Sequence, residues 1–338
     1  MASVDVIVPC YNYGRFLREC VESVLTQDGV AVRVLIIDDC SSDDSEQVGR
    51  SLAAEDPRVE FRRHEKNQGH IATYNEGLEW IAGDYCLLLS ADDLITPGAL
   101  QRAASFLDAN ASVGFVYGKV IRWKAEEVRP PHMLQAGFET VITPGAAWIR
   151  RLCEGGEPLT TSPEIVVRTS LQKQFGGYRT DLPHWADVEM LLRYAARSDI
   201  GYLDCEQAYY RIHRENMHNG FRGIREFEQR RMTFRAFFEE SNLAIQDGAS
   251  LKKLALRTLA ENACWRAHQA FSQGDRKTSE SCLQFARDTD PSIRSSKVYR
   301  RIRWKRLLGR TLWSFAAGCR NPIARRRLHS SGQRSDMQ

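Results

Sequence analysis

The stretch Asp84–Leu94, Asp-Tyr-Cys-Leu-Leu-Leu-Ser-Ala-Asp-Asp-Leu, is the most informative part of the sequence for the fold. Its apolar run, Tyr85–Leu89, is followed by two small residues and the adjacent carboxylates of Asp92 and Asp93. This pattern predicts a buried strand that carries both acids to the edge of a sheet. Ligands of open α/β sheets bind beyond the carboxyl ends of the strands, and hard divalent cations prefer carboxylate oxygens. The alternative is that Asp92 caps a helix starting near Pro97 while Asp93 is solvated.

The sequence before this stretch alternates between strand and helix patterns. Apolar runs predict strands at Val4–Val8, Val32–Ile37 and Val59–Arg63, and helical spacing follows each of them. With the strand at Tyr85–Leu89 there are four alternations, which are typical of a Rossmann-like, mostly parallel sheet that is doubly wound and flanked by helices. We expect Ser41 or Ser42 to cap the second helix. The glycine-rich loops of dinucleotide dehydrogenases and of phosphate-loop hydrolases are absent from the sequence, which argues against both classes.

Length and composition indicate an α/β domain with a helical extension. The chain has 338 residues and a net charge of +4, and basic residues are concentrated near its end. We expect a catalytic domain at 1–220, an all-α extension at 221–320 and a basic, disordered tail at 321–338. Nine scattered cysteines without a Cys-x-x-Cys pair predict reduced thiols. With no signal-peptide or membrane-span pattern, the expected location is the cytoplasm.

Several motifs resemble those of the family 2 glycosyltransferases, which have a GT-A fold. They are Val6–Leu17 at the first strand and turn, Ile36–Ser45, Asn67-Gln-Gly, Tyr74-Asn-Glu-Gly and Gly83-Asp-Tyr. In Ile36–Ser45, Cys40 stands where the family usually has glycine. The family's metal motif is commonly Asp-x-Asp, whereas this sequence reads Ser90-Ala-Asp92. The second acid of the motif, Asp92, is therefore the expected metal ligand.

The resemblance implies a metal-dependent hexosyltransferase that moves a sugar, with inversion, from a nucleotide-diphosphate sugar to a hydroxyl group. Asp39 would bind the base, Tyr11 would pack against it, and UDP is the family default. Asp92, with Asp93 as the second candidate, would hold Mn or Mg. The nucleotide-sugar site implied by the resemblance consists of Pro9, Tyr11, Asp39, Asn67, Asn75, Ser90, Asp92 and Arg211.

A second acidic stretch, Asp181–Arg193, is a helix pattern with Asp187 in its first turn. The positive end of a helix favours an ionised Asp187, and an ionised carboxylate is what a general base needs. Glu189 is expected on the face opposite the buried stripe, beside Arg193. The stretch resembles the family's second acidic motif, which makes Asp187 the expected catalytic base. The alternative is that Asp187 only complements the helix dipole.

The segment Tyr210–Asn216 follows a predicted edge strand and resembles a third family signature. Through that resemblance Arg211 and His213 become candidates to meet the diphosphate. His213 is also a candidate metal ligand, because imidazole suits Mn better than Mg. Upstream, Val113–Trp123 is expected to form two short strands.

The C-terminal residues carry helical patterns, and Tyr299–Cys319 combines arginines with tryptophans and leucines. Such a helix suits a peripheral contact with the inner membrane face, and its alternative is a helix docked on the protein. The expected acceptor is a saccharide or a lipid-linked saccharide in cell-surface polysaccharide or glycoconjugate synthesis, and we expect no nucleic acid partner. Two alternatives remain open: a non-catalytic nucleotide-sugar-binding module, suggested by Ser90, and a nucleotidyltransferase. The latter should carry a glycine-rich basic loop, of which Pro9–Arg15 offers little.

Overall fold

The computed structural model describes residues 1–338 except 134–136, 156–159, 218–222, 241–242, 244 and 319–338. The chain divides into two compact units, Met1–Ala255 and Leu256–Gln338. The first unit extends past residue 220, where we expected the catalytic domain to end. The predicted disordered tail at 321–338 lies outside the described residues.

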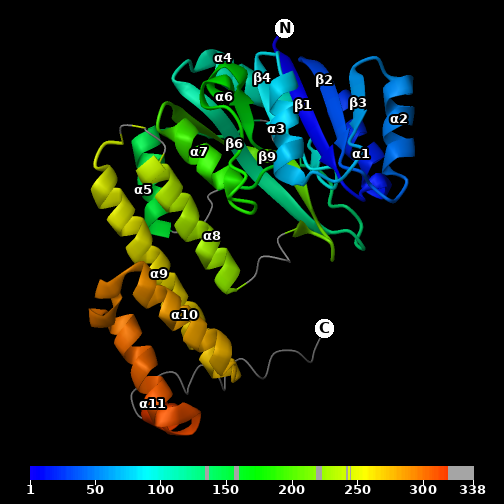
Figure 1. The fold of residues 1–338 in the computed structure, drawn as a ribbon. Coiled ribbons are helices and arrows are strands. Elements are labelled where there is room, and N and C mark those ends of the chain that lie inside the picture. Colours follow the sequence, from blue (N-terminus) through cyan, green and yellow to red (C-terminus); the bar gives the residue numbers. More distant parts are fainter. Residues whose placement is uncertain (134–136, 156–159, 218–222, 241–242, 244, 319–338) are drawn as a thin grey trace, which may run out of the picture. The chain divides into compact units, whose positions relative to one another are not determined.

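One sheet forms the centre of the first unit (Figure 1). In the described part of the chain its strand order is β3-β2-β1-β4-β8-β6-β9-β5, and β7 pairs with β9. Strands β1 to β4 pair in parallel, β8 is antiparallel to β4 and β6, and β6 runs parallel to β9. The strands are β1 Ser3–Cys10, β2 Ala31–Asp38, β3 Val59–Arg63, β4 Tyr85–Leu88, β5 Leu94–Ile95, β6 Val113–Lys124, β7 Thr140–Thr143, β8 Val166–Arg168 and β9 Asp199–Ile212.

Helices cover both faces of this sheet, so β1 is buried on each side. Val4, Val6 and Val8 belong to a core cluster with residues of α1, α2 and α4, whereas Ile7 belongs to a second cluster with residues of α3, α5, α7 and α8. A strand with two buried faces needs a continuous apolar run, which is what the sequence has. The helices are α1 Gly14–Leu25, α2 Ser45–Glu55, α3 His70–Trp80, α4 Ala99–Ala109, α5 Gly145–Gly155, α6 Thr169–Phe175, α7 Ala186–Ala195 and α8 Ile224–Arg235, followed by the π-helix η2 Ala236–Glu240. The predicted mostly parallel sheet flanked by helices is confirmed.

Three local predictions are wrong. Val113–Lys124 is one continuous strand rather than two, with irregular pairing near Gly118. Strand β9 is not an edge strand, because β6 lies on one side of it and β5 and β7 lie on the other. Neither Ser41 nor Ser42 caps α2, which begins after Asp44 without a side-chain cap. The Ser41 hydroxyl instead accepts the backbone N–H of Asn12 at 2.8 Å.

The second unit is helical, as predicted. Helix α9, Gly248–Gln273, enters it and is followed by α10 Arg276–Thr289, the 3-10 helix η3 Pro291–Ser295 and α11 Lys297–Gly318. Its buried residues include Leu259, Phe271, Leu283 and Ile302. Within the described ranges, no helix has both the length and the apolar character needed to cross a membrane.

Candidate functional site

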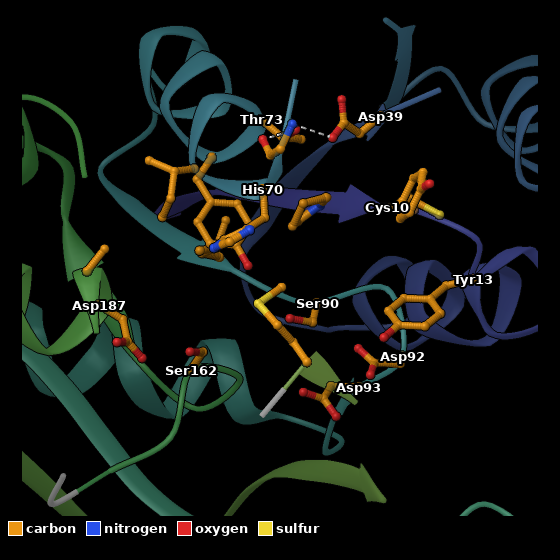
Figure 2. A pocket seen from close by; sticks show the side chains of 18 of the residues that line it. Cys10, Tyr13, Asp39, His70, Thr73, Ser90, Asp92, Asp93, Ser162 and Asp187 are labelled. Atoms are coloured by element: carbon orange, nitrogen blue, oxygen red, sulfur yellow. Dashed lines mark hydrogen bonds between the residues drawn. The ribbon is translucent and has the colours of Figure 1, made fainter. Parts of the chain in front are cut away.

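A cavity of about 440 Å³ opens at the carboxyl ends of β1, β2 and β4 (Figure 2). Figure 2 shows Asp39 near the top of the view, Asp187 and Ser162 at the lower left, Ser90 near the centre, and Asp92 and Asp93 together at the lower right. The predicted site residues that line the cavity are Pro9, Tyr11, Asp39, Asn67, Ser90, Asp92, Asp93 and Asp187. Asn75, Arg211 and His213 do not belong to the lining. The structure thus brings together acids that lie up to about 150 residues apart in the sequence.

Asp39 follows β2 and lies almost wholly buried at the cavity wall. Its carboxylate accepts the backbone N–H groups of Gln68 and Gly69 at 2.7 and 2.9 Å. His64 Nδ1 lies 2.7 Å from Asp39 Oδ1, and its Nε2 lies 2.8 Å from Glu76 Oε2. Three neighbouring groups therefore fix the orientation of the Asp39 carboxylate.

Asp92 and Asp93 lie in a turn after β4, where the sequence placed them. Asp92 Oδ2 lies 2.9 Å from His213 Nε2, and Asp93 Oδ1 accepts the backbone N–H of Arg211 at 2.9 Å. Burial, followed by the charge of Asp92, raises the pKa of Asp93 well above its ordinary value. The alternative that Asp92 caps a helix is wrong, because α4 starts at Ala99 with Gly98 before it.

Arg211 lies behind the two acids. Its Nε donates to the Asp92 carbonyl oxygen at 2.8 Å, and a terminal nitrogen donates to Glu19 at 2.6 Å. The guanidinium lies over the rings of Phe16 and Trp123, at 4.4 and 4.7 Å from their centroids. In this arrangement the side chain supports the loop that carries the acids.

The acids fit a divalent cation that shares its oxygen ligands with a diphosphate. Within the described residues, the hydrogen bonds of the two carboxylates occupy Asp92 Oδ2 and Asp93 Oδ1. A cation of the Mg or Mn kind commonly takes one or two carboxylates plus phosphate oxygens, so a complete protein cage is not required. No group of three or more His, Cys, Asp or Glu side chains positioned for a metal occurs in the described part of the chain.

Asp187 lies in the first turn of α7, as predicted, and it is half-buried at the cavity wall. Burial raises its pKa, although the backbone N–H of Val188 and the Ser162 hydroxyl act in the opposite direction. Burial therefore opposes the ionisation that the helix N-terminus is expected to favour.

Glu189 was expected on the face of α7 opposite the buried stripe, and this expectation is wrong because the residue is 2% exposed. Arg193 Nε donates to it at 3.0 Å, so the two residues do lie side by side. The pair is buried because α6 and the turn after it cover this face, where Arg193 donates to the Phe175 carbonyl.

Sequence reasoning missed His64 and Tyr74. Tyr74 lines the cavity from α3 and packs edge-on against His70 and Tyr178. Burial raises its pKa, and the charges of Asp187 and Asp92 act in the same direction. The Tyr74 phenol is therefore near both sets of acids. Its position in the quoted Tyr-Asn-Glu-Gly motif was the available signal.

Asn75, the neighbour of Tyr74, holds the loop after α6. Its Nδ2 donates to the Tyr178 carbonyl at 3.0 Å, and its Oδ1 accepts the Tyr178 N–H at 2.6 Å. The side chain thereby fixes the segment whose ring packs against Tyr74. This places Asn75 behind the cavity wall.

Comparisons with known proteins agree with this geometry. Residues 5–160 match the family model described as "Glycosyl transferase family 2". An uncharacterized glycosyltransferase of Nostoc sp. is 28% identical over 221 residues, which cover 64% of this chain and 66% of that protein. The succinoglycan biosynthesis protein ExoO of Rhizobium meliloti is 30% identical over 145 residues, covering 40% of this chain and 41% of ExoO. The matched part of the chain spans less than two thirds of the length of each of these relatives.

A solved structure gives the fold over a longer range. Residues 1–349 of S. aureus TarS, crystallised with UDP-GlcNAc, superpose with a TM-score of 0.65 at 20% identity. The superposition covers 90% of this chain and 91% of that one. The GT-A fold predicted from the sequence is thereby confirmed.

Proposed function

We propose that this chain, whose residues 5–160 belong to glycosyl transferase family 2, transfers a sugar from a nucleotide-diphosphate sugar to a hydroxyl group with inversion. The observation that carries the proposal is one cavity lined by Asp39, Asp92 with Asp93, and Asp187. Each acid lies at the end of a strand or in the first turn of a helix, where the backbone holds it in place. The three positions match a base-binding acid, a diphosphate site and a general base.

The donor proposed is a UDP-sugar. Asp39, held from behind by His64 and two backbone N–H groups, presents its carboxylate to the cavity, where a base N–H can donate to it. Tyr11 is 49% exposed at the rim, which leaves its ring free to pack against a base. The structure of TarS with UDP-GlcNAc supports this choice of nucleotide, on a fold of the same class.

Asp92 and Asp93 would hold the cation, Mn or Mg, and His213 is the third candidate. When bound, the cation would neutralise charge on the leaving diphosphate as a Lewis acid. Arg211 supports these acids from behind, through the Asp92 carbonyl and the Asp93 carboxylate. Ser90 lines the same part of the cavity and is proposed to contact the donor.

Asp187 is the proposed general base. It would take the proton of the acceptor hydroxyl while the acceptor oxygen attacks the anomeric carbon from the face opposite the diphosphate. One such base suffices, because a single inversion forms no covalent glycosyl intermediate. The raised pKa makes Asp187 a stronger base than an exposed aspartate once it is ionised.

The proposed acceptor is a saccharide or lipid-linked saccharide, and the likeness to a succinoglycan biosynthesis protein supports a role in polysaccharide synthesis. The enzyme would act in the cytoplasm, in contact with the inner membrane face through α11. Trp304 and Leu307 are 60% and 69% exposed on that helix, among the exposed Arg300, Arg301 and Arg303. Cosedimentation with phosphatidylglycerol vesicles, weakened in Trp304→Ser and absent with phosphatidylcholine, would support this contact.

An assay of sugar transfer tests the proposed function. Purified protein is incubated with Mn and a panel of labelled UDP-sugars, with membrane lipids and oligosaccharides as acceptors. We expect UDP release and labelled product with one donor, lost in Asp187→Asn and kept in Asp204→Asn, whose carboxylate faces Lys119 on the surface. Equal product from wild type and Asp187→Asn would contradict the assigned base. UDP-sugar binding without any product would favour a binding module.

A further inference from the structure

His64 lies between two carboxylates, and neither belongs to its own strand. It follows β3, while Asp39 follows β2 and Glu76 lies on α3. The residue is 7% exposed, with Nδ1 2.7 Å from Asp39 Oδ1 and Nε2 2.8 Å from Glu76 Oε2. An ionised carboxylate can only accept hydrogen bonds, so both contacts form together only when both ring nitrogens carry a proton. The geometry therefore suits an imidazolium.

The contacts of Asp39 occupy most of the hydrogen-bond acceptor positions of its carboxylate. A carboxylate offers about four lone-pair positions. Asp39 Oδ1 is taken by His64 and the Gln68 N–H, and Oδ2 is taken once by the Gly69 N–H. One position on Oδ2 remains for a ligand. Its direction is set by the groups behind it, of which His64 is the one that titrates near neutral pH.

The charges around His64 favour the imidazolium. Burial alone would lower its pKa, but hydrogen bonds to Asp39 and Glu76 outweigh burial and raise the pKa above its ordinary 6.5. On β3, Arg62 lies 3.4 Å from the other oxygen of Glu76. Next to His64, Arg63 pairs with Asp38 and Glu46, and the exposed residues Glu65 and Lys66 follow in the chain.

We infer that His64 is a positioning residue for the nucleotide: as an imidazolium bridging Asp39 and Glu76, it holds the Asp39 carboxylate aimed at the cavity, and nucleotide affinity falls when it loses its proton. This inference rests on the proposed donor site. After deprotonation, one bare ring nitrogen faces a carboxylate oxygen, so the ring and Asp39 must separate or Glu76 must turn away. Glu76 sets the pH at which this happens without touching the ligand cavity.

The test is calorimetric titration with UDP-glucose and Mg between about pH 6 and about pH 8.5, because the diphosphate of this probe does not titrate in that range. The wild-type affinity should fall about tenfold as the pH rises, the worth of one charge-assisted hydrogen bond. In His64→Asn the amide nitrogen replaces the Nδ1 donor without titrating, so the affinity should be independent of pH. In Glu76→Gln the fall should move to lower pH.

Two further measurements make the comparison specific. Glu79→Gln removes a charge from the exposed face of the same helix and should keep the wild-type profile. His70 and His184 also line the cavity, so only the difference between wild type and His64→Asn reports on His64. Nitrogen-detected NMR of the imidazole in the free protein should show a raised pKa that drops in Glu76→Gln.

The outcomes separate this inference from the proposed function. UDP-glucose binding with the same pH profile in wild type, His64→Asn and Glu76→Gln would overturn the inference and leave the donor site standing. An imidazole pKa unchanged by Glu76→Gln would also overturn it. No UDP-glucose binding by any variant at any pH would overturn the UDP-sugar site itself and this inference with it.

Discussion

Asp92 and His213 lie 121 residues apart in the sequence, yet His213 Nε2 is 2.9 Å from Asp92 Oδ2 in a buried contact. The contact joins the turn after β4 to the loop after β9. Asn216 Nδ2 donates to the same oxygen at 3.2 Å. The loop after β9 therefore orients the acid that is proposed to bind the cation, and changes in that loop should alter metal binding.

His213→Ala should weaken Mn-dependent nucleotide binding by about 10- to 100-fold, as loss of a group that orients a metal ligand does. His213→Gln places an amide nitrogen near the position of Nε2, so it should restore most of the affinity. Mn titration monitored by electron paramagnetic resonance measures both variants. Equal loss in His213→Ala and His213→Gln would argue that the imidazole itself binds the metal.

Asp187→Asn should abolish turnover while making the protein more stable. Its raised folded-state pKa means that folding favours the protonated form, so ionisation above the ordinary 3.8 opposes folding. An amide removes that cost, on the order of 1 kcal/mol at neutral pH, and the gain should shrink as the pH falls toward 3.8. Thermal unfolding of both proteins between about pH 5 and about pH 8 measures this. Lower stability of Asp187→Asn at neutral pH would contradict the account.

Cys40→Gly should stabilise the fold. Cys40 has a φ of 61°, in the left-handed region that favours glycine. Relief of this strain, less the added freedom of the unfolded chain, should give about 0.5–1 kcal/mol. Cys40→Ala is the matched control, because it removes the thiol and keeps the strain. A gain in urea unfolding shared by both variants would assign the effect to the thiol instead.

Asp5 is a buried acid, 1% exposed, and should be costly to replace. Burial raises its pKa, but hydrogen bonds from Arg33 and from the N–H groups of Ala82 and Gly83 outweigh burial and lower it. Because the folded pKa is depressed, the stability that Asp5 contributes is present above the ordinary 3.8 and is lost as the pH falls through the folded pKa.

Asp5→Ala leaves these backbone groups without an acceptor and should cost about 2–3 kcal/mol in urea unfolding. Arg33→Ala is the comparison: Arg33 is about half exposed, and Asp5 keeps both backbone donors, so about 1 kcal/mol or less is expected. A larger loss in Arg33→Ala would contradict this assignment.

The parts of the fold that sequence predicts best are those in which local pattern and position agree. The alternation through Leu89 and the acids at 92 and 93 were placed correctly, because buried parallel strands have continuous apolar runs with polar residues at their ends. The strands β6 and β9 were misjudged because their pairing is not local. Nothing near Tyr202 indicates that β5 and β7 lie on the far side of β9.

The sequence predicted the acidic residues of the site but not the side chains that hold them in position. Asp39, Asp92 and Asp187 follow recognisable patterns. His64 contacts Asp39 and Glu76 only because β2, β3 and α3 come together in the fold, which local sequence does not indicate. Glu189 was expected on the surface because helical spacing cannot report what covers the polar face of a helix. Arg211 was expected at the diphosphate, whereas its guanidinium lies behind the acids, against Phe16 and Trp123.

The proposed function depends on a metal-dependent nucleotide site at Asp92. Calorimetric titration of UDP, GDP and dTDP, each with and without Mn, tests it in wild type, in Asp92→Ala and in Asp204→Ala as a surface control. We expect one nucleotide, UDP, to bind to wild type and to Asp204→Ala only when Mn is present, and we expect no binding to Asp92→Ala. Failure of all three nucleotides to bind the wild type, or equal binding by Asp92→Ala, would rule out this site.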